Sequence, residues 1–191
     1  MPSNAFIVHL RQLLEDPEEL DQAHFRLGTG FPGRQYGLAS INRAMVVMSV
    51  SAWESYIEEL MRECLTALHP PAGVAVGAWP ALNAYVLGLI ANFNTPDQGR
   101  VERIIRLSIG LVDVHLSWVW QNSTSAQAVQ RLEDAMRFRH EIAHGVNPRP
   151  IVHHAYASQL PSFFRNLARH TDDAVRDHLV NVHGIGNPWP P

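Results

Sequence analysis

Lysine is absent from this chain of 191 residues, and cysteine occurs once, at Cys64. A single cysteine excludes an internal disulfide and is typical of proteins from reducing compartments. The N-terminus also lacks the charged and then apolar pattern of a secretory signal, so we expect a cytoplasmic protein. Only 17% of the residues are charged, and the net charge of -3 argues against a general nucleic-acid coat protein.

Charged side chains are missing altogether from residues 64–96, which raises the question of a membrane segment. A bilayer span needs about 20 consecutive apolar residues, and this stretch is interrupted too often to provide them. The interrupting residues are Pro70, Pro71, Pro80, Asn83, Asn92 and Asn94. We therefore expect a buried helical hairpin here and no membrane span.

All 15 basic residues are arginine, and their distribution along the chain is uneven. Residues 100–191 contain 10 arginines and eight acidic residues, whereas residues 1–63 contain five arginines and nine acidic residues. The forked guanidinium group suits two-pronged contacts to phosphate. We expect a polyanion to meet the second half of the chain, through a local patch.

Apolar residues recur at intervals of three and four along most of the sequence, and no stretch alternates as a strand would. The length suits one domain. We predict an all-α helical bundle over residues 1–191, with a core at about 36–183 and an N-terminal helical extension at 1–35. The dipeptide Asp16-Pro17 predicts a helix start. The helices are expected at about 4–15, 17–27, 36–68, 80–91, 98–107, 113–120, 124–144 and 161–183, and Trp53 and Tyr56 are expected in the core.

The candidate site lies at the end of the predicted helix 124–144, just before Gly145. At 100° per residue, Arg139, His140 and His144 fall within an arc of about 140°, next to the apolar stripe of that helix. Imidazole exchanges protons near neutral pH, and a guanidinium group stays charged and grips phosphate. Three such groups on one helix end favour chemistry on a phosphate.

RNA carries its own nucleophile, the 2′-hydroxyl group. A histidine base, a stabilising arginine and an oriented phosphate are sufficient for transesterification without metal or cofactor. The pattern therefore predicts an endoribonuclease that leaves a 2′,3′-cyclic phosphate. Arg137 and Arg149 flank the segment and are the expected substrate contacts, while Glu133 and Asp134 are placed to orient or restrain Arg139.

The same segment allows a second interpretation, as a zinc site. His140-Glu141-Ile142-Ala143-His144 reads H-E-x-x-H, in which two histidines bind zinc and the glutamate activates water. The extended pattern would need glycine at 147 and histidine at 150, where the chain has Asn147 and Pro150. No glutamate follows Glu141, so a third ligand of that type is missing. The zinc peptidase is the less favoured alternative.

Arg139-His140 followed by His144 resembles the motif of the HEPN family: arginine, a polar residue, three variable residues and histidine. The chain is most similar to the RiboL-PSP-HEPN group. Segment 51–60 resembles that group's early long helix, 93–96 its mid-chain turn and 165–179 its final helix, so the likeness covers about residues 38–180.

The resemblance implies an all-α fold of the HEPN type with additional short helices. It implies that Arg139 and His144 are the catalytic pair and that His140 is the polar auxiliary. Two protomers would join their motifs in one composite RNA cleft at a homodimer interface. The implied role is a toxin or phage-defence nuclease, with a nucleotidyltransferase-like antitoxin as a possible partner. A non-catalytic HEPN module that binds RNA, nucleotide or a partner protein stays open as the alternative.

Overall fold

The computed structural model describes residues 1–28, 38–71, 77–145 and 151–189. Within these ranges the chain is helical almost throughout, and its one β-type pairing is an isolated bridge between Trp120 and Ser123. The prediction of an all-α fold is confirmed. The helices are η1 (Ala5–Leu10, of π type), α1 (Arg11–Leu27), α2 (Leu38–Ala67), α3 (Trp79–Ala91), α4 (Gln98–Ile109), η2 (Val114–Ser117, of 3-10 type), α5 (Ser125–Ala143), α6 (His154–Ala157) and α7 (Leu160–Asn181).

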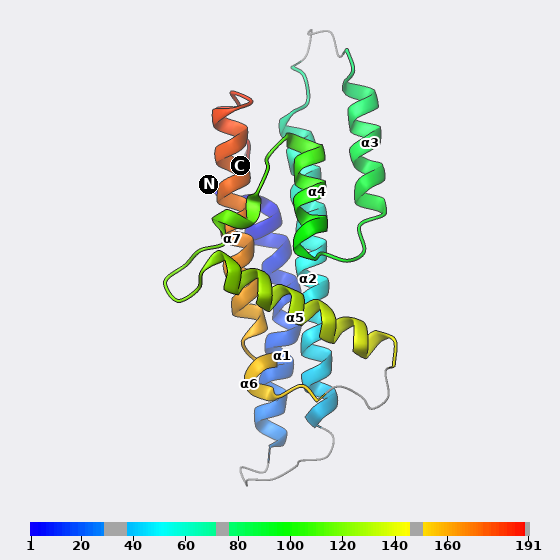
Figure 1. Cartoon of the computed structure of the whole chain (residues 1–191), viewed down its shortest axis with the longest axis vertical. Helices are drawn as coiled ribbons and strands as arrows, with labels where there is room; N and C mark the ends of the chain where they lie inside the picture. The colour runs from blue at the N-terminus through cyan, green and yellow to red at the C-terminus, as the bar shows by residue number, and fades with distance from the viewer. Residues whose placement is uncertain (29–37, 72–76, 146–150, 190–191) are drawn as a thin grey trace.

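Helix α2 is the centre of the bundle. It contacts η1, α1, α3, α4, α5, α6 and α7. Figure 1 shows α1, α2 and α7 running along the long axis of the molecule, while α5 crosses over them at a steep angle. The C-terminal end of α5 therefore extends past α2 to the side of the bundle, and this end holds the candidate site.

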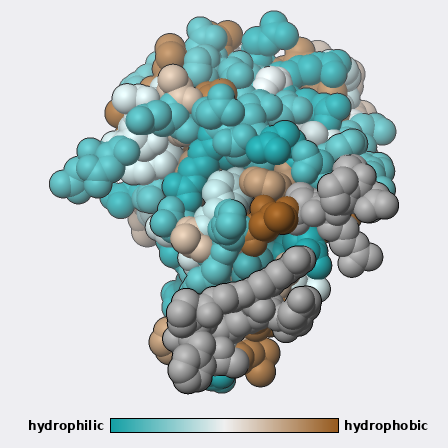
Figure 2. All heavy atoms as spheres, turned by 60° about the horizontal axis from the view of Figure 1, so that its bottom comes forward, coloured by the Kyte–Doolittle hydropathy of each residue, from teal (hydrophilic) through white to brown (hydrophobic). Residues whose placement is uncertain are grey.

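The core gathers around two aromatic residues of α2. Trp53 and Tyr56 are fully buried, as predicted, and Trp118 packs edge-on against Trp53 with ring centroids 6.3 Å apart. The indole N–H of Trp53 donates to the carbonyl of Pro96 at 2.9 Å, and the Tyr56 hydroxyl donates to the carbonyl of Ala168 at 2.9 Å. Both polar tips are thus satisfied inside the core. The face seen in Figure 2 is by contrast largely hydrophilic, with apolar atoms in small groups.

The predicted helix start at Asp16-Pro17 is wrong. The π-helical turn η1 runs directly into α1, and Pro17 lies inside α1. A proline within a helix removes one backbone hydrogen bond and crowds the preceding turn. Leu14 and Pro17 are both buried, so the packing of α1 along α2 outweighs that local cost.

The prediction that residues 64–96 are buried is wrong for α3. Only Val86 and Ile90 of this helix are buried, whereas Leu82, Tyr85 and Leu87 are 37%, 51% and 39% exposed. Helix α3 lies at the edge of the bundle in Figure 1, where it packs against α2 and α4. Among the described residues, no helix has the length and hydropathy needed to cross a bilayer.

Two carboxylates fasten the N-terminal segment to the bundle. Asp172 of α7 is 1% exposed and accepts hydrogen bonds from the backbone N–H of Ser3, at 3.1 and 3.2 Å to its two oxygens, and from the Ser3 hydroxyl. Glu63 of α2 accepts from the backbone N–H groups of Asn4, at 3.1 Å, and Ala5. Burial raises the pKa of Asp172 to about 6, against the opposing effect of the hydrogen bonds from Ser3.

We predict that Asp172→Asn raises the melting temperature at pH 7.5. A carboxyl pKa that is higher in the folded than in the unfolded chain adds stability at low pH, which is lost as the pH rises through about 6. A carboxyl pKa raised from its ordinary value to about 6 corresponds to at most about 3 kcal/mol. Asparagine keeps an oxygen that can accept from Ser3 but carries no charge.

The measurement is thermal unfolding of wild type and Asp172→Asn between pH 5 and 7.5. The difference between their melting temperatures should grow as the pH rises, while Asp16→Asn, at an exposed position of α1, should show no such trend. A variant that is less stable than wild type at pH 7.5 would show that the ionised carboxylate is a net stabiliser.

Candidate active site

Helix α5 presents the motif on its last turn. The helix begins at a capping box, in which the Thr124 hydroxyl accepts from the backbone N–H of Gln127 and the Gln127 side chain accepts from the backbone N–H of Thr124. It ends with His144 as its C-terminal cap, and Gly145 follows with φ +62°, a conformation that favours glycine. The predicted helix 124–144 is confirmed to within one residue at each end.

Arg139 turns toward α2. Its Nη2 lies 3.9 Å from Oε2 of Glu54, and the two side chains are 31% and 19% exposed. Burial raises the pKa of the Glu54 carboxyl, and the nearby Arg139 charge lowers it. The ion pair is thus half-buried and joins the end of α5 to the middle of the central helix.

The prediction that Glu133 or Asp134 orients Arg139 is wrong for Asp134. The Asp134 carboxylate accepts instead from Nη2 of Arg137, at 3.1 Å. The reason is helical geometry, because residues three apart share a face and residues five apart do not. Glu133 is exposed and makes no ion pair among the residues described. The sequence gives no indication that Glu54, on another helix, is the partner of Arg139.

His140 and His144 lie side by side on the outer face of α5. Their ring centroids are 4.3 Å apart and the ring planes differ by 47°. Both residues are exposed. The structure therefore brings the two imidazoles together and leaves them open to solvent, while Arg139, from the same turn, reaches toward α2. A substrate or a second subunit can approach the histidine pair without any rearrangement of the core.

Arg137, which flanks the motif, is more exposed than Arg139, but it has two carboxylate neighbours. Besides its bond to Asp134, its Nη1 lies 3.6 Å from the carboxylate of Glu141, and its guanidinium stacks 4.7 Å from the ring centre of Phe138. The hydrogen bond that Arg137 donates to Asp134 is the main cause that raises the pKa of Arg137. A phosphate bound at Arg137 would have to compete with these carboxylates. Arg149, the other expected substrate contact, lies outside the described residues.

A zinc site on the two histidines would need a third ligand. Among the described residues, one group of three potential metal ligands is close enough to share an ion, and it consists of Glu102, Asp113 and His115 on α4 and around η2. His140 and His144 belong to no such group in that part of the chain. Among the described residues, no third ligand joins His140 and His144, so the zinc peptidase stays the less favoured alternative.

Comparison with protein-family models, with curated proteins and with solved structures finds no match to this chain. The resemblance to the HEPN family accordingly stays a prediction from the sequence. Any function has to be argued from the side chains that the fold brings together.

We predict that Glu54→Gln loosens the Arg139 side chain with little effect on global stability. A partly exposed ion pair contributes about 1 kcal/mol or less, so the melting temperature should change by only a few degrees. The mobility of the Arg139 side chain, measured by 15N relaxation of its Nε–H group, should increase clearly.

Glu58→Gln is the matched control. Glu58 lies one turn further along α2, and its carboxylate is 4.0 Å from Arg62 and makes no ion pair with a described residue of α5. It should leave the Arg139 signal unchanged. Equal mobility of Arg139 in wild type and Glu54→Gln would show that the ion pair does not restrain the guanidinium group.

Proposed function

We propose that this protein is a metal-independent endoribonuclease whose catalytic residues are Arg139, His140 and His144. The observation that carries the proposal is the pair of exposed imidazoles of His140 and His144, whose ring centroids are 4.3 Å apart. They lie on the same helical turn as Arg139, whose guanidinium group is paired with the partly buried carboxylate of Glu54. Histidine and arginine side chains are sufficient for phosphodiester transesterification, as base, acid and stabiliser of the phosphoryl charge. The sequence resemblance to the HEPN family points to the same three residues.

The reaction we propose is an attack within the substrate. One imidazole, assigned to His144, takes the proton of the 2′-hydroxyl group, and the 2′-oxygen forms a bond to phosphorus. The bond from phosphorus to the 5′-oxygen breaks, and a protonated imidazole returns a proton to that leaving oxygen. The products are a 2′,3′-cyclic phosphate and a 5′-hydroxyl group. Arg139 would stabilise the negative charge that grows on the phosphoryl oxygens in the transition state.

The different directions of Arg139 and of the histidine pair support a composite site. Within one chain the guanidinium faces Glu54 while both imidazoles face solvent. A homodimer that apposes two α5 ends would surround one phosphate with both sets. We further propose, from the resemblance, a toxin or phage-defence role with RNA as substrate and a nucleotidyltransferase-like antitoxin as the regulating partner.

A second candidate is a non-catalytic HEPN module that binds RNA, a nucleotide or a partner protein. One observation favours it: the two motif arginines within the described residues, Arg137 and Arg139, both have carboxylate neighbours. Neutralised guanidinium groups stabilise a transition state less well than unpaired ones. This candidate predicts tight binding of RNA without turnover.

We expect purified protein to cleave RNA in the presence of EDTA and to leave DNA of the same sequence intact. His144→Ala and Arg139→Ala should each lower the rate by at least about 100-fold, which is the usual contribution of a general acid–base group. The assay is cleavage of a labelled single-stranded RNA, with analysis of the product ends for cyclic phosphate.

His153→Ala removes an exposed histidine outside the motif and should retain the wild-type rate. Cleavage that requires added metal, or that persists in His144→Ala, would refute the mechanism. Stoichiometric zinc in the purified protein would direct attention back to the peptidase. RNA binding with no cleavage by wild type would favour the non-catalytic module.

Mixing two inactive variants tests the composite site. If groups from both chains contact one phosphate, a heterodimer of the two variants still forms one complete set. The Arg139→Ala chain supplies His144, and the His144→Ala chain supplies Arg139. Co-refolded mixtures should recover a measurable part of the wild-type rate, whereas each variant alone stays inactive. A mixture that forms heterodimers, verified by a tag on one chain, yet stays inactive would show that each site is built within one subunit.

A further inference from the structure

A groove on another side of the molecule has the chemistry of a small-ligand site. It lies between the N-terminal helical segment and α7 and consists of two adjoining hollows of about 220 and 300 Å³. Both hollows are lined by Phe6 and Arg165, so they lie next to each other. The lining residues come from the first 11 residues and from α7, and none belongs to α5. The groove is therefore distinct from the proposed ribonuclease site.

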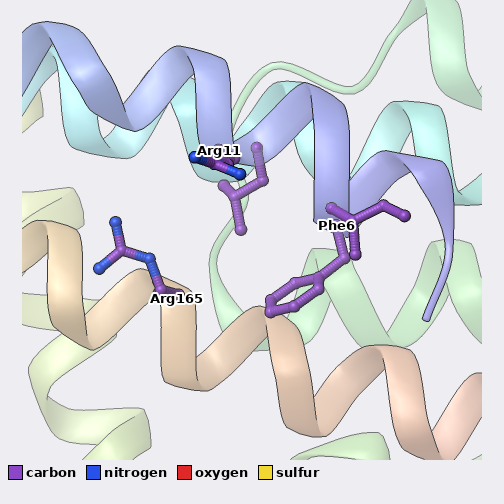
Figure 3. Close-up of a pocket in the computed structure, with 5 residues that line it drawn as sticks. Phe6, Arg11 and Arg165 are labelled. Carbon is purple, nitrogen blue, oxygen red and sulfur yellow. The ribbon is translucent and has the colours of Figure 1, made fainter. Parts of the chain in front are cut away.

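The first hollow combines an apolar floor with cationic walls. Phe6, Ile7 and Leu10 supply the apolar surface, and the remaining lining residues are Arg11 and Arg165. Figure 3 shows the two guanidinium groups on facing helices toward one end of the opening, with the ring of Phe6 toward the other end. This hollow has no acidic residue in its lining.

The second hollow continues past Phe6 along α7 and is more polar. Arg169 and Asn166 line it together with Asp172 and Asp173. The two carboxylates are already engaged, since Asp172 accepts from Ser3 and Asp173 accepts from Arg176 at 2.7 Å. The charge of Asp173 is thus balanced by Arg176, whereas Asp172 accepts only from neutral donors and keeps its own charge when ionised.

Two of the groove arginines have no carboxylate partner among the described residues, whereas six other arginines in that part of the chain do. Arg62, Arg100 and Arg137 each pair with an acidic residue three or four positions away on the same helix. Arg11 and Arg169 have Glu15 and Asp173 at that spacing, yet neither makes an ion pair with any residue that the structure describes. Both keep their full charge for an anion.

Arg165, the residue common to both hollows, is held in place. Its Nη2 lies 2.6 Å from the carboxylate of Glu18 on α1. One ion pair uses part of the five-donor fork of a guanidinium group, and the other donors stay available for a ligand. The contact also links α1 to α7 beside the groove.

We propose that this groove binds a small organic anion. Its apolar body would lie against Phe6, Ile7 and Leu10, and its phosphate or carboxylate would bridge Arg11 and Arg165, which match both groups with paired donors. The two hollows together have the volume of a typical small-molecule site, about 300–1,000 Å³. A nucleoside monophosphate and a short acyl carboxylate share this chemistry, and binding measurements separate them.

The test is isothermal titration calorimetry of the full chain with three probes: adenosine 5′-monophosphate, octanoate and inorganic phosphate. We expect adenosine 5′-monophosphate or octanoate to bind, and whichever binds more tightly identifies the source. Inorganic phosphate should bind at least 10-fold more weakly, because it has no apolar body to place against Phe6. If inorganic phosphate bound as tightly as the organic probes, the groove would attract anions by its surface charge alone, and the proposal would be overturned.

Arg11→Ala and Arg165→Ala should each weaken binding at least 10-fold. Arg26→Ala, which removes an exposed arginine further along α1, should have no effect, and neither should His144→Ala. Arg11 has no ion pair within the described ranges, so its variant should fold normally, as circular dichroism can verify. No binding of either organic probe at 10 mM, or binding that is sensitive to His144→Ala and not to Arg11→Ala, would refute this site without bearing on RNA cleavage.

Discussion

The burial of the middle of α2 is the constraint on which the rest of the structure depends. Trp53 and Tyr56 sit on adjacent turns of this helix and are fully buried, and each directs its one polar group to a backbone carbonyl of another segment. An indole N–H or a phenol hydroxyl left unpaired in a core costs about 1–3 kcal/mol. These bonds therefore fix the turn before α4 and the middle of α7 relative to α2, in addition to the packing itself.

The same stretch of α2 also positions the candidate site. Glu54 directly follows Trp53, so its side chain leaves the helix about 100° away from the buried indole and reaches the boundary between core and solvent. There it meets Arg139 of α5 at 3.9 Å. Since Trp53 is locked in the core, the direction in which Glu54 leaves α2 is fixed as well. The direction of the Arg139 guanidinium is thus tied to the core through two neighbouring residues of one helix.

Much of this architecture could be predicted from local patterns. The periodicity of α2, the capping residues of α5 and the glycine that ends α5 each act within a few residues, and the structure has those helices where they were expected. The failures have non-local causes. Pro17 stays inside a helix because packing along α2 holds α1 together. Helix α3 is apolar but exposed because the bundle offers it neighbours on one side, which composition alone does not reveal.

The candidate site shows the same division. Two histidines four residues apart necessarily share a helical face, so their proximity follows from spacing alone. Glu54, the partner of Arg139, is 85 positions away in the chain, and no local sequence pattern predicts that the two side chains meet. Helical spacing could have indicated that Arg137, three residues after Asp134, was its better partner. Helical spacing identifies the residues of the motif, whereas tertiary packing determines which side chains they contact.

The placement of charge bears on how anions would meet this acidic protein. Around the motif, Arg137 and Arg139 have carboxylates within 4 Å, so a phosphate there must displace or share existing partners. In the groove beside α7, Arg11 and Arg169 have no such neighbours among the described residues, and only Arg165 is paired. A small anion gains most where no carboxylate has to be moved. A second subunit would bring its own carboxylates together with its own arginines, so a homodimer leaves the ratio of guanidinium to carboxylate groups at the motif unchanged. Under the proposed function, what a homodimer adds for a long polyanion is therefore more contacts, a second pair of imidazoles and a second guanidinium group, and not an excess of positive charge.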